Sequence, residues 1–301
     1  MDQIQQAVVG QFSQRRVLDW FRSAKLQKRV SIGFSLIVLS VGLVFFLFPI
    51  YWMVTASLKT LDEVFLFPPS WWPKELQWQN YREALTFMPF GRYALNTILV
   101  TSANVVGTVL SCSLVAFAFA RLRAKVRDVM FLFVLSTMML PPQVTMIPVY
   151  ILFQRLGMVD TYWPLTLPAF FATSPFSIFL LRQFFMTVPK ELDEAALIDG
   201  CSYFGIWWRV LLPAAKPALL TVALFTFTAH WNDLLGPLIY INSYEKLTLA
   251  LGLANFRAMY GATPWHLLMA ASIVVVAPCL LVYGLSQRYF MQGIVITGSK
   301  G

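Results

Sequence analysis

The hydrophobic positions of the chain gather in six long runs that are almost free of charged residues. Charged residues bound most of these runs, and Gly236-Pro237 ends the fifth. A helix needs roughly 20 apolar residues to cross a bilayer, and each run is near that length. The pattern therefore predicts six transmembrane helices, at residues 30–58, 93–120, 129–154, 161–181, 217–235 and 264–287.

The segments outside these runs complete the predicted organisation. We expect a tail at residues 1–29, a six-span domain at 30–290 with a long polar connection at 182–216, and a second tail at 291–301. The first run is longer than the apolar core of a signal peptide, which has only about 7–15 residues, and it begins late in the chain. We therefore expect it to be a retained membrane anchor.

Composition agrees with a protein embedded in the membrane. Of the 301 residues, 58% are hydrophobic and 12% are charged, with a mean hydropathy of +0.66. Soluble domains carry about 25% charged residues. Soluble, collagenous, disordered and disulfide-rich secreted classes are thereby excluded, and an all-α membrane protein is predicted. The three cysteines lie far apart and predict neither a metal site nor a disulfide framework.

The net charge of +9 could indicate a nucleic-acid partner, but its distribution favours membrane topology. Most basic residues lie in the tail before the first run, in the second and fourth connections, and after the last run. Short loops rich in Lys and Arg stay on the cytoplasmic side. We therefore expect both termini in the cytoplasm and no nucleic-acid partner.

Two segments are predicted to lie at the membrane surface. In the first tail, Val17, Trp20 and Phe21 share a helical face among basic residues, which is typical of a helix in the inner interface; an unstructured basic tail is the alternative. After the first run, the aromatic segment 67–73 and Trp78 should fold back along the outer surface near the lipid headgroups.

The sequence contains no recognisable catalytic group. Two histidines, His230 and His266, stand apart, and no HExxH, GxSxG or CxxC pattern occurs. No GxxxxGK[ST] phosphate loop occurs either, so we do not expect this chain to hydrolyse ATP. The chain is therefore not expected to be an enzyme.

The connection at 182–216 contains a predicted acidic helix. Pro189 suits a first helical position, and Gly200 suits the C-terminal stop. Acidic residues near a helix start are favoured by the helix dipole. A second helix is expected at Tyr203–Leu212. A solvated loop with a chance charge cluster is the alternative, but it does not explain a capped helix between two spans. The acidic residues are Glu191, Asp193, Glu194 and Asp199.

The same connection resembles the EAA loop of ABC-importer permeases. The matching pattern is Glu194-Ala195-Ala196, three residues, Gly200, nine residues, Val210, one residue, and Leu212-Pro213. Further stretches are similar to the carbohydrate-uptake branch, in particular to MalG-like subunits of maltose-type systems. These stretches are Pro141-Pro142-Gln143-Val144, Leu156–Thr161, Trp231-Asn232-Asp233 and Gln287–Phe290.

The resemblance implies a type I ABC-importer permease of the bacterial inner membrane. It implies a second homologous permease, two ATPase subunits that use ATP and Mg, an extracytoplasmic solute-binding protein, and no cofactor bound by this chain. The loop would be a coupling helix that docks on an ATPase subunit. Its docking residues would be Glu191, Asp193, Glu194, Ala195, Ala196, Asp199 and Gly200, with Leu212 and Pro213 positioning the loop.

A substrate route can be proposed from polar residues at membrane depth, which usually face the protein interior or a cavity. Pro141 starts a break in the third span, with Gln143 and Thr145 beside it, and Asn232 and Asp233 should lie in the last turn of the fifth. The alternatives are a packing kink at the break and a hydrated carboxylate at Asp233.

The cargo class is only partly readable from the sequence. Relatives in the resembled family carry disaccharides, glucosides of polyols and glycerol phosphate. A phosphate cargo would favour Arg or Lys inside a span, and we predict none there, which favours neutral sugars. A stand-alone secondary carrier or a membrane enzyme would be the alternative function. A carrier should show an ionisable relay at mid-membrane depth, and none is predicted.

Overall fold

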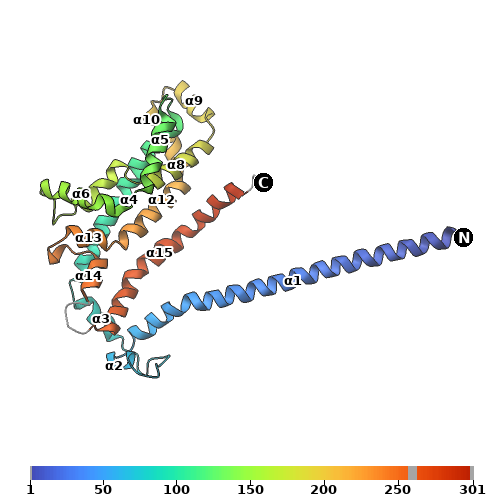
Figure 1. The fold of residues 1–301 in the computed structure, drawn as a ribbon, viewed down its shortest axis with the longest axis horizontal. Helices are drawn as coiled ribbons and strands as arrows, with labels where there is room; N and C mark the ends of the chain where they lie inside the picture. Colours follow the sequence, from blue (N-terminus) through green and yellow to red (C-terminus); the bar gives the residue numbers. More distant parts are fainter. Residues whose placement is uncertain (1, 257–262, 299–301) are drawn as a thin grey trace.

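The computed structural model describes the backbone of residues 2–256 and 263–298, and the side chains of residues 28, 31–256 and 263–287. All regular secondary structure of the described residues is helical, joined by turns and irregular segments (Figure 1). Four stretches are long and apolar enough to span a membrane, and two bent helix pairs raise the number to six. The predicted six-span, all-α fold is therefore confirmed.

The six spans differ in continuity. Four spans have no sharp bend: Ser31–Ser57 in α1 (Asp2–Ser57), α4 (Phe90–Arg121), Trp163–Thr187 and Trp265–Gln287 in α15 (Trp265–Gly298). The Trp163–Thr187 span comprises α7 (Trp163–Thr166), η2 (Leu167–Phe171) and α8 (Pro175–Thr187). Two spans are bent helix pairs. The first pair turns by 97° between Arg127–Met139 and α6 (Pro142–Arg155). The second pair turns by 83° between Tyr203–Ala214 and α12 (Lys216–Trp231).

Short helices form the connections. They are α2 (Leu61–Val64), α3 (Gln79–Thr86), α9 (Glu191–Ile198), α13 (Leu235–Tyr240), η4 (Tyr244–Lys246) and α14 (Leu249–Phe256). The first bent pair begins with α5 (Arg127–Ser136) and η1 (Thr137–Met139). The second begins with α10 (Tyr203–Ile206), the π-helical turn η3 (Trp207–Leu211) and α11 (Leu212–Ala214). In Figure 1, α9 and α10 lie at one end of the bundle, and α2 and α3 lie at the opposite end.

Helix α4 is the centre of the bundle and packs against α8, α12 and η2. Gly107 permits the close approach, because a Cβ atom there would lie 3.1 Å from the backbone carbon of Ala169. In lipid, helices associate through such close packing and through hydrogen bonds rather than through the hydrophobic effect. The close contact of α4 with η2 therefore helps to hold the bundle together.

Polar side chains of α4 also pair with the irregular backbone of the Trp163–Thr187 span. Asn104 Nδ2 donates to the Leu165 carbonyl at 2.9 Å. Ser111 Oγ donates to the Ala169 carbonyl at 2.7 Å and accepts from the Ala172 N–H at 3.1 Å. Ala172 has a φ of 54°, in the left-handed region where a helix cannot continue. These bonds satisfy backbone groups that lipid could not.

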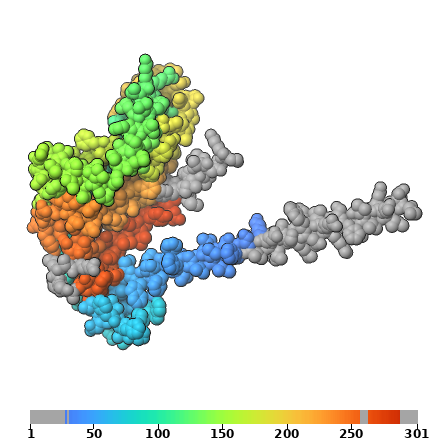
Figure 2. Space-filling view, in the orientation of Figure 1, coloured from blue at the N-terminus to red at the C-terminus, as the bar shows by residue number. Residues whose placement is uncertain are grey.

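Helix α1 stands apart from the bundle. None of the most apolar window of its span is buried, and it packs mainly on α15 (Figure 2). Its end is fastened by Asn80, whose Nδ2 donates to the carbonyls of Ser57 and Lys59 at 2.9 and 2.8 Å. The ring of Trp71 lies edge-on to Trp52, 6.4 Å between centroids. The predicted aromatic segment thus folds back onto the end of α1.

Several predicted boundaries need correction. Asp233 lies beyond α12, which ends at Trp231, and its Oδ1 accepts from the Gly236 N–H at 3.0 Å. Its carboxylate therefore lies just outside the last turn of α12, in the turn that leads into α13. The fourth span continues to Thr187 and includes Arg182, and the α4 span includes Arg92 and Arg121, so the expectation of spans without basic residues was wrong at these helix ends.

The predicted tails are not separate from the spans. Helix α1 runs without interruption from Asp2, and α15 continues to Gly298. The interfacial-helix prediction depends on the side chains of Val17, Trp20 and Phe21, which lie outside the described residues. In the Gln287–Phe290 stretch, the side chains of residues 288–290 also lie outside them.

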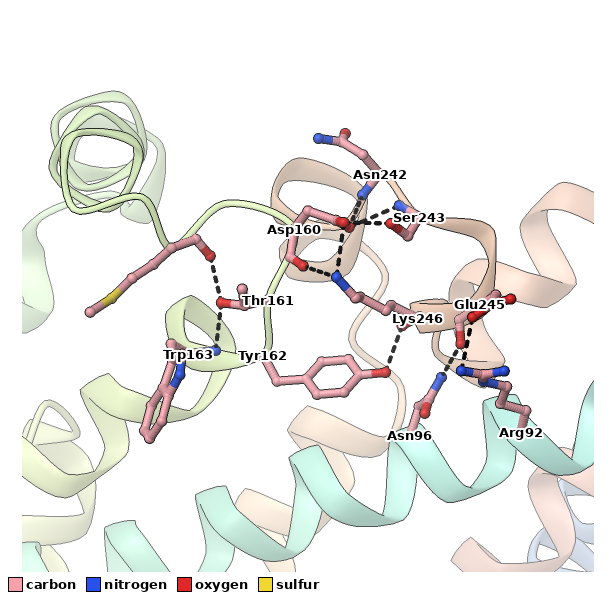
Figure 3. Close-up of polar contacts among 11 residues, drawn as sticks. Arg92, Asn96, Asp160, Thr161, Tyr162, Trp163, Asn242, Ser243, Glu245 and Lys246 are labelled. Carbon is pink, nitrogen blue, oxygen red and sulfur yellow. Dashed lines mark hydrogen bonds and ion pairs between the residues drawn. The ribbon is translucent and has the colours of Figure 1, made fainter.

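A polar network at the α3 end joins three segments (Figure 3). The Asp160 Oδ1 accepts from the Asn242 and Ser243 N–H groups at 3.0 and 2.8 Å, and Oδ2 accepts from the Ser243 hydroxyl and from Lys246 Nζ, the latter at 2.9 Å. On α4, Asn96 Nδ2 donates to the Glu245 and Leu247 carbonyls at 3.0 and 2.9 Å. The turn before α7 and the loop after α13 are thereby held against α4.

The Asp160→Asn variant tests this network. Hydrogen bonds from Ser243, above all, hold the pKa of Asp160 well below its usual range, helped by Lys246. Asn tolerates the left-handed φ of 61° at this position, so the change removes charge without adding backbone strain. We expect the free energy of unfolding in detergent to fall by about 1–2 kcal/mol.

The expected pH dependence follows from the lowered pKa. The unfolded chain has an Asp pKa of about 3.9, and folding lowers the pKa of Asp160. Its ionised carboxylate therefore adds its full contribution to the stability of the fold above about pH 3.9, and this contribution is lost as the pH falls toward the folded pKa. The difference in melting temperature from wild type should therefore be constant between roughly pH 5 and 8 and shrink in stronger acid. The exposed Asp62→Asn serves as the control; an equal shift in both variants would contradict the network.

Candidate functional site

The acidic helix α9 has well-defined ends. It begins at Glu191, so Pro189 precedes the helix and the predicted first position was wrong by two residues. It ends in a Schellman arrangement, with Cys201 N–H donating to the Ala196 carbonyl at 2.9 Å and Gly200 N–H donating to Leu197 at 3.0 Å. Gly200 has a φ of +80°, which a side chain would strain, so the predicted stop is confirmed.

A buried ion pair fastens α9 to the end of α4. Arg121 Nε lies 2.7 Å from Asp193 Oδ2, and the two side chains are 4% and 14% exposed. Arg121 Nη2 also donates to the Val188 carbonyl at 2.8 Å, in the turn before α9. Burial raises the pKa of Asp193, and the Arg121 charge opposes that rise. A single side chain of α4 thus holds both the helix and the turn that leads into it.

Apolar contacts hold the rest of the connection. Ala196 is 9% exposed and belongs to a buried cluster that includes Phe185, Trp207 and Leu211. Leu212 packs partly against this cluster, whereas Pro213 is exposed beside the bend before α12. The 83° bend follows from the chain, because prolines near the starts of α11 and α12 lack the N–H that a continuous helix needs. The connection is therefore a packed unit.

The outward face of the connection is both acidic and apolar. Glu191, Glu194, Ala195 and Asp199 are exposed. Exposed apolar side chains surround them, with Ile198 the most exposed at 87%. A groove of about 410 Å³ follows α9, lined in part by Asp199, Gly200, Phe204 and Trp208. Such a mixed, exposed surface is typical of a protein–protein contact.

The structure divides the predicted docking residues into two groups. Asp193 and Ala196 face their own bundle, through the ion pair with Arg121 and through the apolar cluster. The others lie on the exposed side or at its edge: Glu191, Glu194, Ala195, Asp199 and Gly200. Helical spacing explains this division. Asp193 and Ala196 are three residues apart and so lie on the same face of α9, whereas Glu194 and Ala195 between them point elsewhere.

A second candidate site is a cavity of about 450 Å³ inside the bundle. It lies among α4, the Trp163–Thr187 span, α12 and α13. Its polar lining comes from Asn104, Thr108, Ser177, Thr226, His230 and Asp233, and its aromatic lining comes from Phe176, Phe225 and Tyr240. Of the residues predicted to line a route, only Asp233 borders this cavity.

The other predicted route residues lie elsewhere. Asn232 is exposed, and its Nδ2 donates to the Thr228 carbonyl at 2.9 Å. Pro141, Gln143 and Thr145 are exposed at the start of α6, and the Thr145 hydroxyl donates to the Pro142 carbonyl at 3.0 Å. The break at Pro141 is confirmed, with a turn of 97°. None of these three residues borders the cavity, although Tyr150 farther along α6 stacks on Tyr240 of its lining. These residues could line a route only together with another subunit.

Sequence reasoning missed Arg121 and the polar groups on α4. Arg121 was assigned only to the basic loops that set topology. Asn104 and Thr108 are four residues apart inside an apolar run, so they share one face of the helix. That spacing of polar residues within a predicted span was the available signal for the cavity.

Breaking the ion pair should loosen the connection. Arg121→Met leaves the Asp193 carboxylate without its buried partner, and removal of one partner from such a pair costs about 3–5 kcal/mol. We expect a clear fall in the melting temperature of the purified protein. Adding Asp193→Leu should recover part of the loss, because the uncompensated charge is then removed. The exposed Arg123→Met is the control, and a loss of the same size there would contradict the assignment.

Comparisons with known proteins agree on one family. Residues 112–296 match the family described as "Binding-protein-dependent transport system inner membrane component". The sn-glycerol-3-phosphate transport system permease protein UgpE of Pectobacterium atrosepticum is 36% identical over 87% of this chain and 95% of its own. The diacetylchitobiose uptake system permease protein DasC of Streptomyces coelicolor is 32% identical over 91% and 98%.

A solved structure and a further relative are also similar. The probable ABC transporter permease protein YurM of Bacillus subtilis is 34% identical over 84% of each chain. The fold resembles the crystal structure of a bacterial ABC transporter involved in the import of the acidic polysaccharide alginate, with a TM-score of 0.76, 24% identity, and coverage of 87% of this chain and 97% of that chain. By family model and by relatives, this chain belongs to the inner-membrane permease components of binding-protein-dependent transport systems.

Proposed function

We propose that the chain is one of two homologous permease subunits of an ATP-driven importer for sugars or sugar-like solutes. Two ATPase subunits bind at the α9 end, and an extracytoplasmic solute-binding protein delivers cargo at the opposite end. Family membership favours this function over a stand-alone carrier or a membrane enzyme. The exposed flanks of α1 and α6 provide surface for the second permease.

The observation that carries the proposal is the attachment of α9. The helix is capped at Gly200, ion-paired to α4 through Asp193, and packed through Ala196. Its exposed residues Glu194 and Ile198 are left for a partner. A displacement of α9 must therefore carry the end of α4 with it. Alternating access by rocking of one helical bundle against another needs such a rigid connection.

Both termini and α9 would lie in the cytoplasm. Arg121, Arg123, Lys125 and Arg127 gather at the α9 end, which agrees with the excess of Lys and Arg in cytoplasmic loops. The ATPase subunits would supply the binding and hydrolysis of ATP with Mg. No ATP would be bound by this chain.

Reversing a charge on α9 tests the docking surface. Glu194→Lys should lower both ATP-dependent sugar uptake and copurification of the ATPase more than about tenfold, since loss of an interfacial charge pair costs roughly 2–5 kcal/mol. The control for ATPase binding is Glu75→Lys, the same reversal at an exposed position at the opposite end, which should leave copurification of the ATPase unchanged. Normal uptake and normal copurification in Glu194→Lys would show that α9 is not the coupling element.

Site-directed labelling tests the orientation. Single cysteines at Ile198 and at Glu75, in a chain whose native cysteines are replaced, should react with a membrane-impermeant maleimide from opposite sides. Ile198→Cys is expected to react in inside-out vesicles and Glu75→Cys in right-side-out vesicles. The reverse pattern would contradict cytoplasmic docking.

A further inference from the structure

The cavity among α4, α8, α12 and α13 contains hydroxyl groups that the fold itself does not use. Thr108 and Thr226 are 5% and 8% exposed, and both line the cavity. Neither hydroxyl has a hydrogen-bond partner among the described residues. Helical threonines commonly bond the carbonyl one turn back, as Thr221 does with Pro217 at 2.9 Å and Thr97 does with Tyr93. Buried polar groups without partners are uncommon, and here they face open space.

Asn104 adds an acceptor to the same wall. Its Nδ2 donates to the Val100 and Leu165 carbonyls at 2.8 and 2.9 Å, which uses both amide protons. The Oδ1 atom has no partner among the described residues and is left to accept. Thr108 is one helical turn from Asn104 on α4, and Thr226 faces the cavity from α12. Two helices thus present donors and acceptors around one space.

The remaining lining disfavours an anionic cargo, and its one imidazole, His230, lies on α12 close to Asp233. None of the described residues that border the cavity is Arg or Lys, whereas recognition of a phosphate normally uses one or both. The one carboxylate, Asp233, would repel an anion. Tyr240 and the packed pair Phe176 and Phe225, 5.8 Å between ring centroids, add aromatic surface to the lining. Apolar and aromatic walls with a few well-placed polar groups are typical of small-molecule sites.

We infer that this cavity is a subsite for a neutral sugar residue of the transported cargo, contributed by this subunit alone. The inference rests on the proposed import function. Thr108, Thr226 and Asn104 bond the sugar hydroxyls, and the aromatic wall covers the apolar face of the ring. The cargo class is then a neutral oligosaccharide, unlike the glycerol phosphate for which the Pectobacterium relative is named.

Uptake by the complete transporter tests the subsite. The complex of both permeases, the ATPase and the binding protein is reconstituted in proteoliposomes. ATP-dependent uptake is measured for N,N′-diacetylchitobiose, arabinotriose and trehalose, and for sn-glycerol 3-phosphate. We expect uptake of a neutral probe and none of the phosphate. Thr108→Val with Thr226→Val should lower neutral uptake about tenfold, because two hydrogen bonds are lost without a change in side-chain volume.

The controls separate binding from folding. Thr221→Val removes a hydroxyl from the same α12 helix, where it bonds only its own backbone, and should leave uptake unchanged. Thr226→Ser restores a hydroxyl and should restore most uptake. Basal ATP hydrolysis should be the same in all variants. Unchanged uptake in the double Val variant, or wild-type transport of glycerol phosphate in preference to sugars, would overturn the inference.

A labelling experiment keeps the test decisive if the Val variants fail to assemble. Thr226→Cys, in a complex whose native cysteines are replaced, should react with a small methanethiosulfonate reagent. The transported neutral probe should slow the reaction, and glycerol phosphate should not. Absence of protection would overturn the subsite. Failure of the wild-type complex to take up any probe with ATP would instead count against the proposed import function itself.

Discussion

Backbone groups at membrane depth have no water to bond, so every break in a helix must be satisfied by the protein itself. This chain has breaks in three of its six spans, and α4 side chains supply the partners at one of them. Asn104 and Ser111 bond the backbone between Leu165 and Ala172, and Arg121 bonds Val188 beyond the same span. The bundle is consequently organised around α4, and both candidate sites border that helix.

The two candidate sites are linked through the same helix. At one end, Arg121 holds α9 through Asp193, while Asn104 and Thr108 line the cavity farther along α4. A rigid helix transmits a displacement over its length, because its backbone bonds resist compression and bending. Movement of the acidic helix would thus reach the cavity wall without any contact between the two. The close packing at Gly107 leaves α4 and η2 no room to approach each other further.

The sequence predicted the features that depend on local chemistry. Apolar run length located the spans, and the acidic first turn with Gly200 located α9 and its stop, to within two residues at Pro189. Contacts between residues that lie far apart in the sequence were not predicted. Arg121 and Asp193 are far apart in sequence, and nothing local distinguishes an arginine that sets topology from one that is buried. Likewise, the direction in which α6 leaves Pro141, which decides where Gln143 points, is set by tertiary packing.

The position of Asp233 shows the same limit in detail. A continuous helix through the fifth apolar run would place its charge at a C-terminal end, and the chain instead starts a new helix there. The carboxylate then bonds Gly236 N–H. The length of an apolar run does not show whether a polar pair such as Asn232-Asp233 lies in the last turn of one helix or in the turn between two helices.

The separation of α1 from the bundle has a consequence for biogenesis. A span that makes its main contact with α15, which follows it at the far end of the bundle's sequence, lacks that packing surface until the intervening helices have been synthesised. It must therefore be stable in lipid by its own hydropathy, and its mean hydropathy of 2.5 is the highest of the four spans without a sharp bend. Its sequence is thus constrained by insertion into the bilayer more than by the shape of a neighbour, and many apolar substitutions along Ser31–Ser57 should be interchangeable.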